Sequence, residues 1–86
     1  MKEGKNMKPY AKLRAKMTEL DISNGDVANF LNKSPSYVSY RLNNRYSWKI
    51  SDAYKVLELL NLPEESISFY FPPDAGLPKR SKGKQW

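Results

Sequence analysis

The chain of 86 residues contains neither cysteine nor histidine. Without cysteine there is no disulfide, no thiolate nucleophile and no sulfur ligand for a metal. The absence of histidine removes the usual general base and the commonest metal ligand. The acidic residues are scattered over predicted helix starts and surfaces and form no nucleophile–base pair. We therefore expect no cofactor, no metal centre and no enzymatic activity.

Long hydrophobic runs are also missing. No apolar stretch approaches the roughly 20 residues that a membrane-spanning helix needs. The N-terminal residues 1–6 are not followed by the apolar region of a signal peptide. The sequence predicts one small domain in the cytoplasm. We expect no membrane contact and no separate domain for a small-molecule effector.

Charge is distributed unevenly along the chain, which carries 15 Lys and Arg, 9 Asp and Glu, and a net charge of +6. Residues 32–50 hold four basic residues and no acid, whereas acidic residues dominate 17–31 and 51–74. Both ends of the chain are basic. Such separation is typical of a protein that turns one face toward phosphate and another toward protein.

The apolar periodicity predicts an all-α fold, a compact domain of four to five short helices. The first helix opens at Pro9 and runs to about Leu20, and a later one is capped by Ser51. Residues 66–71 either form a short C-terminal strand or continue a helix that starts near Pro63. The predicted core comprises the apolar residues on the inner helix faces: Leu13, Met17, Leu20, Val27, Leu31, Val38, Leu42, Ile50, Val56, Leu57 and Leu60.

The predicted domain organisation has three parts. Residues 1–8 are polar and basic, which indicates a flexible arm. Residues 9–72 form the folded domain, and residues 73–86 form a disordered basic tail.

Residues 24–44 read as two short helices joined by a tight turn. Asn32 tolerates a left-handed backbone and so ends the first helix. Ser34 caps the second helix, and Pro35 takes its first position, where the missing N–H costs nothing. Ala28 is small at the place where the two helices must cross. This is the layout of a DNA-binding helix-turn-helix, whose second helix enters the major groove.

These residues resemble a known family. Val27-Ala28, Asn32 and Val38 are spaced as in the helix-turn-helix of small phage repressors of the Cro/C1 (xenobiotic-response-element-like) type. Residues 34–45 resemble the family's recognition helix and exit loop, and 50–71 resemble a Cro-like subgroup from phages of Gram-positive bacteria. The resemblance covers roughly residues 10–72. It implies a transcriptional repressor that binds an inverted-repeat DNA operator as a homodimer. At Pro35 the family often has Gln or Arg, and proline can touch only a thymine methyl.

The helix-turn-helix geometry assigns three sets of candidate residues. Base contacts fall on the start and the outer face of the second helix: Pro35, Ser36, Tyr37, Ser39, Tyr40 and Asn43. Contacts to the DNA backbone come from polar residues around the motif: Asn24, Lys33, Ser34, Arg41, Asn44, Arg45 and Lys49. A dimer contact is predicted at the aromatic C-terminal segment: Ile67, Phe69, Tyr70 and Phe71.

Other interpretations remain open at this stage. The serines and tyrosines of the second helix are also what an ordinary polar helix surface contains, and the lysines and arginines also serve solubility. Trp48 either stacks on the DNA backbone or seals the core, and we favour the core. The main alternative function is a protein-interaction module, such as an antirepressor or antitoxin of similar fold, which would use the aromatic C-terminal segment.

Overall fold

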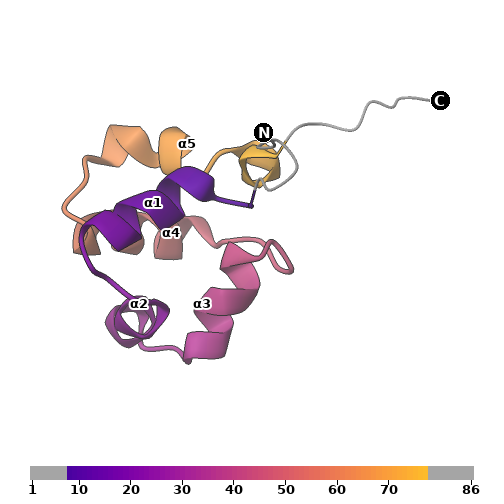
Figure 1. The fold of residues 1–86 in the computed structure, drawn as a ribbon. Helices are drawn as coiled ribbons and strands as arrows, with labels where there is room; N and C mark the ends of the chain where they lie inside the picture. The colour runs from indigo at the N-terminus through magenta and orange to yellow at the C-terminus, as the bar shows by residue number, and fades with distance from the viewer. Residues whose placement is uncertain (1–7, 78–86) are drawn as a thin grey trace.

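The computed structural model describes residues 8–77, and these residues form an all-α fold without a strand. The elements follow one another as α1 (Ala11–Glu19), α2 (Asn24–Leu31), α3 (Pro35–Leu42), α4 (Ile50–Leu59), the 3-10 turn η2 (Glu64–Ser66), α5 (Ile67–Tyr70) and the turn η3 (Pro73–Gly76). Figure 1 shows α2 and α3 together at one end of the domain and α5 at the other, with α1 and α4 between them. No helix of the described chain is long and apolar enough to cross a membrane.

Four helices end in the same way, with an Asn or Asp in the left-handed conformation. These residues are Asp21, Asn32, Asn44 and Asn61, with φ between 59° and 63°. After each, the next N–H donates to the carbonyl oxygen five residues back, as in Lys33 to Ala28 at 2.8 Å and Arg45 to Tyr40 at 2.8 Å. This is the Schellman arrangement, here built on Asx residues in place of the usual glycine. The predicted role of Asn32 is confirmed, and the same chemistry sets the other three turns.

Two helix starts differ from the prediction. Pro9 does not open α1, because Tyr10 precedes the helix in the left-handed conformation (φ 55°, ψ 43°). Such a backbone costs a non-glycine residue about 1 kcal/mol, and it lets the Tyr10 N–H donate to the carbonyl oxygen of Ala75 at 2.9 Å. Helix α4 begins at Ile50 after an extended Lys49, so Ser51 lies inside the helix and is not its cap.

The core lies where α1, α2, α3 and α4 meet. Nine of the predicted core residues are buried, and two are not. Leu20 follows the last turn of α1 and is exposed, while Ile22 packs against the core from the connection that follows. Ile50 stands at the first position of α4 and is 65% exposed. Trp48, two residues earlier, packs against the core, so the predicted core role of Trp48 is confirmed.

The C-terminal part of the described chain is helical and closes the domain against α1. Residues 66–71 contain the end of η2 and all of α5, so the strand alternative is wrong. Ordered structure continues past the predicted boundary at residue 72, because η3 follows and Ala75 is 2% exposed. Residues 78–86 of the predicted tail and 1–7 of the predicted arm lie outside the described residues.

Candidate nucleic-acid interface

The two helices of the predicted motif are fixed by caps at both starts. At α2 the Ser23 hydroxyl accepts from the Asp26 N–H at 3.1 Å, and the Asp26 carboxylate accepts from the Ser23 N–H at 2.9 Å. This is a capping box. At α3 the Ser34 hydroxyl accepts from the Tyr37 N–H at 3.2 Å, with Pro35 as the first helical residue. Ala28 on α2 is fully buried. The chain thus forms a helix, a tight turn and a second helix over the predicted range.

The outer face of α3 is made of small hydroxyl side chains and one tyrosine. Pro35 and Ser36 are exposed at its start, and Ser39 is half-buried one turn later. Tyr40 is 43% exposed. Val38 and Leu42, on the opposite face, are fully buried, as predicted. The exposed side chains of α3 are therefore free of any part in the core.

The structure does not place Tyr37 with this outer face. Its hydroxyl donates to the Asp52 carboxylate on α4 at 2.5 Å. That hydrogen bond raises the pKa of Tyr37, with smaller contributions from burial and from the negative charge of Asp52. We remove Tyr37 from the candidate base contacts because its polar end points to another helix.

Arg41 also differs from its predicted role as an exposed phosphate ligand. Its guanidinium lies 3.5 Å from the centre of the Tyr37 ring, and its Nη1 donates to the Tyr37 carbonyl oxygen at 3.2 Å. The Arg41 Nε is buried without a hydrogen-bond partner. The charge of Arg41 is therefore held against α3 itself.

The side chain of Asn43, at the end of α3, already takes part in hydrogen bonds within the fold. Its Oδ1 accepts from Nη2 of Arg14 on α1 at 3.0 Å, and the same nitrogen donates to the Leu42 carbonyl oxygen at 2.7 Å. The Asn43 amide nitrogen lies 3.4 Å from the Ser39 hydroxyl, at the edge of hydrogen-bond distance. The amide nitrogen can donate to a base without displacing Arg14. The sequence gives no signal of this contact, because Arg14 and Asn43 are 29 residues apart.

Most of the predicted phosphate ligands are exposed. Lys33 and Ser34 stand in the turn before α3, although the Ser34 hydroxyl is occupied as a cap. Asn24 is the first residue of α2 and is exposed. The other exposed residues of this set follow α3 in the loop to α4: Asn44, Arg45 and Lys49. Basic side chains therefore stand before and after the outer face of α3.

A further exposed aromatic residue joins this surface. Tyr46 is 58% exposed, and its ring meets that of Tyr40 edge-on at 5.8 Å. The Arg45 guanidinium lies 5.9 Å from the Tyr40 ring centre. Sequence reasoning missed Tyr46, because a residue in a loop has no periodicity to show which way it faces.

The predicted dimer segment divides into two parts. Phe71 is half-buried and packs on Tyr10 and Trp48, with ring centres at 6.1 and 5.2 Å. It belongs to the fold of the monomer. Phe69 is 53% exposed, and its ring meets that of Tyr70 edge-on at 4.8 Å. Ile67 and Tyr70 are half-buried.

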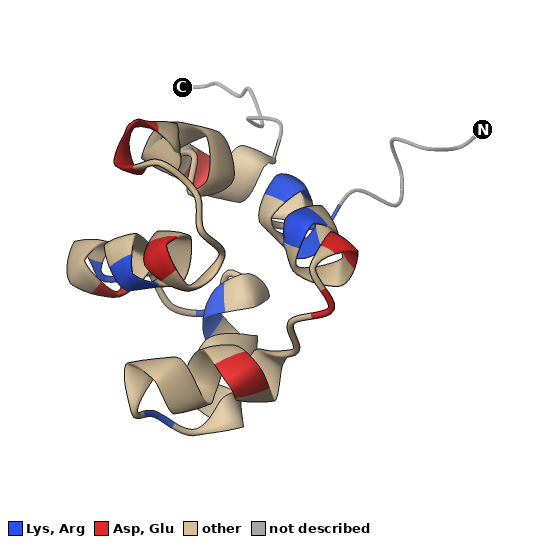
Figure 2. Cartoon of the chain, turned by 90° about the vertical axis from the view of Figure 1, so that its left-hand side faces the viewer, with Lys and Arg blue, Asp and Glu red and all other residues tan. Residues whose placement is uncertain are grey.

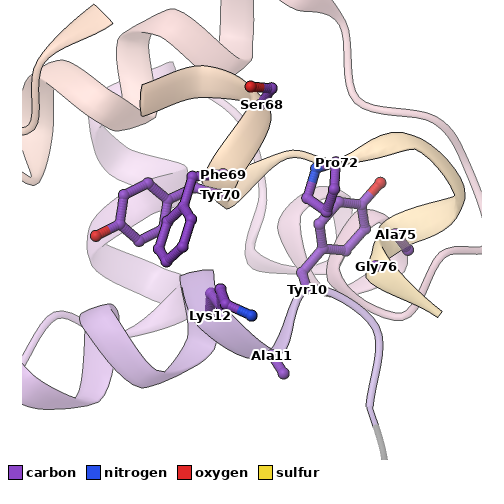
Figure 3. Close-up of a pocket in the computed structure, with 9 residues that line it drawn as sticks. All are labelled: Tyr10, Ala11, Lys12, Ser68, Phe69, Tyr70, Pro72, Ala75 and Gly76. Atoms are coloured by element: carbon purple, nitrogen blue, oxygen red, sulfur yellow. The ribbon is translucent and has the colours of Figure 1, made fainter. Parts of the chain in front are cut away.

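An apolar groove of about 330 Å³ lies beside Phe69, between the start of α1 and the segment from α5 to η3. Figure 3 shows the rings of Phe69 and Tyr70 above Lys12, and Tyr10 beside Pro72. The Lys12 ammonium is 5.3 Å from the Phe69 ring centre. Phe69 is therefore the most exposed side chain of the predicted dimer segment and borders this groove, whereas Ile67 and Phe71 line a second groove of about 370 Å³.

Comparison with known protein families assigns the chain to one of them. The model of one family, described as "Protein of unknown function (DUF739)", matches residues 8–73. The chain belongs to the DUF739 family. No curated protein and no solved structure matches it.

The DUF739 match spans all five α-helices and ends at the first residue of η3. It therefore contains the outer face of α3 and most of the groove beside Phe69, whose lining also includes Ala75 and Gly76. Figure 2 shows the charges on this domain, with several basic positions on α1 and a basic position in the turn between α2 and α3. The described residues contain no cluster of acids that fits a metal ion.

Proposed function

We propose that this DUF739 protein is a sequence-specific transcriptional repressor of the Cro/C1 type. It binds an inverted-repeat operator as a homodimer in the bacterial cytoplasm and blocks a promoter sterically. The observation that carries the proposal is the outer face of α3. Ser36 and Tyr40 are exposed there and Ser39 is half-buried, and none of the three belongs to the core, on a helix capped by Ser34 after a tight turn from α2.

Base contacts would come from residues along that face. A helix of this kind reads base edges with its N-terminal residues and its solvent side. Ser36 and Ser39 supply hydroxyls that donate or accept, and Pro35 offers an apolar contact for a thymine methyl. Tyr40 supplies a phenol one turn beyond Ser36. The Asn43 amide nitrogen can add a donor at the far end.

Backbone contacts would come from the flanking cations. Lys33 precedes α3, and Arg45 and Lys49 follow it, so that phosphates on both sides of a groove can be neutralised. Asn24 and Asn44 add neutral donors. This arrangement fixes the register of the duplex, whereas α3 supplies the sequence preference.

A homodimer would double the number of base pairs read, because one short helix contacts too few for selectivity. The exposed Phe69 and its groove are the surface for that contact. The same groove favours the second candidate function, a protein-interaction module such as an antirepressor or antitoxin.

The test is selection of bound duplexes from a random pool with the purified full chain at low and moderate salt. We expect an inverted repeat whose half-site centres lie about one helical turn apart. Recovery of duplexes without a common motif would indicate that the protein binds DNA through charge alone, without sequence preference. Failure to recover any DNA would contradict the proposal and favour the protein-interaction module.

A further inference from the structure

Asp52 is the one charged residue that is buried in the part of the chain that the structure describes, at 6% exposure. It lies in the first turn of α4, and its Oδ2 accepts the hydrogen bond from Tyr37 on α3. Burial of a carboxylate costs free energy unless hydrogen bonds offset it. A buried polar pair therefore adds little net stability, and its main effect is the geometry that its hydrogen bond imposes.

Helix α3 has few other links to α4. Both helices pack mainly on α2. Among the hydrogen bonds of residues 8–77, the bond from Tyr37 to Asp52 is the only one between side chains of α3 and α4. Apolar packing on α2 permits small rotations and shifts, whereas a hydrogen bond between two side chains has a defined length and direction. The pair can therefore set the orientation of α3 within the limits that the core allows.

Two cations lie against the Tyr37 ring. The Arg41 guanidinium stacks on it at 3.5 Å, and the Lys33 ammonium lies 5.1 Å from its centre. In this position the Arg41 Nε is buried and has no hydrogen-bond partner. The phenol is thus fixed between two cations of the motif and the carboxylate of α4.

We propose that Tyr37 and Asp52 form a positioning pair that sets the orientation of α3 and, through it, the placement of Ser36, Ser39 and Tyr40 against the bases. This inference rests on the proposed function. Neither member of the pair contacts DNA. Because Lys49 precedes α4 by one residue and Asp52 lies in its first turn, the pair also couples the base-reading face to a phosphate-binding position. Supporting residues of this kind decide whether a binding surface has the right geometry.

The test is a double-mutant cycle on DNA affinity with the full chain. The variants are Tyr37→Phe, which keeps the ring and removes the hydroxyl, Asp52→Leu, which removes the acceptor, and the two combined. The probes are the duplex recovered by the selection above and a scrambled duplex of the same composition. We expect each single variant to weaken binding to the selected duplex about tenfold, the size of one hydrogen bond to a charged group.

Non-additivity distinguishes positioning from direct contact. The combined variant should lose no more affinity for the selected duplex than either single variant, since both substitutions remove the same hydrogen bond. Asp52→Asn keeps an acceptor oxygen and should recover most of the lost affinity. The scrambled duplex should be bound equally by all variants. Glu58→Gln, an exposed acid on α4, controls for the loss of negative charge.

Two outcomes would overturn the pair. Additive losses would show that Tyr37 and Asp52 act separately. A change of preference at one base position in Tyr37→Phe, with Asp52→Leu unchanged, would make Tyr37 a direct reader of DNA.

A readout without DNA keeps this inference separate from the proposed function. Amide chemical shifts of α3 should change in the same pattern in Tyr37→Phe and Asp52→Leu, and Asp52→Asn should reverse most of the change. That result would support the pair even if the wild-type chain bound no duplex. Unrelated shift patterns in the two variants would contradict it.

Discussion

Arg14 on α1 donates through Nη2 to the carbonyl oxygen of Leu42, the last residue of α3, at 2.7 Å. Its Nε also donates to the Pro9 carbonyl oxygen at 2.8 Å. The guanidinium therefore joins the start of α1 to the end of α3, and its positive charge stands at the negative end of the α3 dipole.

Loss of this contact should destabilise the fold. We expect Arg14→Ala to lower the free energy of unfolding by about 1–2 kcal/mol, since it removes charged hydrogen bonds at a partly buried site. Urea denaturation measures the change. Thr18→Ala, an exposed position on the same helix, should change it by less than about 0.5 kcal/mol. An effect of Arg14→Ala no larger than that control would show that the contact contributes nothing.

The turn between α2 and α3 depends on the backbone of Asn32, with φ 63° and ψ 42°. Glycine adopts this conformation freely, whereas alanine is strained there by about 1 kcal/mol. Asn32→Gly should therefore keep the urea midpoint close to wild type, and Asn32→Ala should lower it. Asn29→Ala, at an exposed helical position of α2, serves as the control. Equal losses from glycine and alanine at position 32 would assign the effect to the asparagine side chain instead.

The local elements of this motif could be predicted because neighbouring residues decide them. Ser34, Pro35 and Asn32 each act within a few positions of their own place in the chain. The contacts from Arg14 to Leu42 and from Tyr37 to Asp52 could not be predicted. They join residues 28 and 15 positions apart and depend on how the helices are oriented in space. Periodicity separates the inner face of a helix from its outer face. It does not show that a flanking residue such as Tyr37 meets a third helix.

Residues that read bases and residues that bind phosphate should respond differently to substitution. Arg45→Ala should weaken binding to every duplex to a similar degree and reduce the slope of log K against log salt by about 1. Tyr40→Ala should instead change the preferred sequence in a repeated selection. Lys55→Ala, which removes an exposed charge from α4, should change neither property. Equal weakening of all sequences by Tyr40→Ala would remove Tyr40 from base recognition.

The ionisation of Tyr37 gives a test of its environment in solution. The hydrogen bond to Asp52 is the main cause that raises its pKa above 10.0, and the Arg41 charge opposes it. Because the folded pKa is raised, the stability that this group contributes is present below about pH 10 and is lost as pH rises through the folded pKa. Asp52→Leu, which removes the acceptor, should lower the pKa of Tyr37 in an NMR titration of labelled tyrosine carbons. The pKa of Tyr10, which burial raises, should not move. An unchanged Tyr37 titration in Asp52→Leu would mean that the hydrogen bond does not form in solution.

Phe69 and Phe71 stand two residues apart, and substitution by alanine should affect a different property at each position. Phe71 packs on Tyr10 and Trp48, so Phe71→Ala should lower the free energy of unfolding by roughly 2 kcal/mol, less than for a fully buried ring. Phe69 is largely exposed beside the groove, so Phe69→Ala should leave the monomer stable and weaken self-association. Sedimentation velocity at several protein concentrations measures the second effect, and urea denaturation measures the first. If Phe69→Ala and Phe69→Arg both sediment as the wild type does, the groove is not the homodimer contact, and a different protein is its better partner.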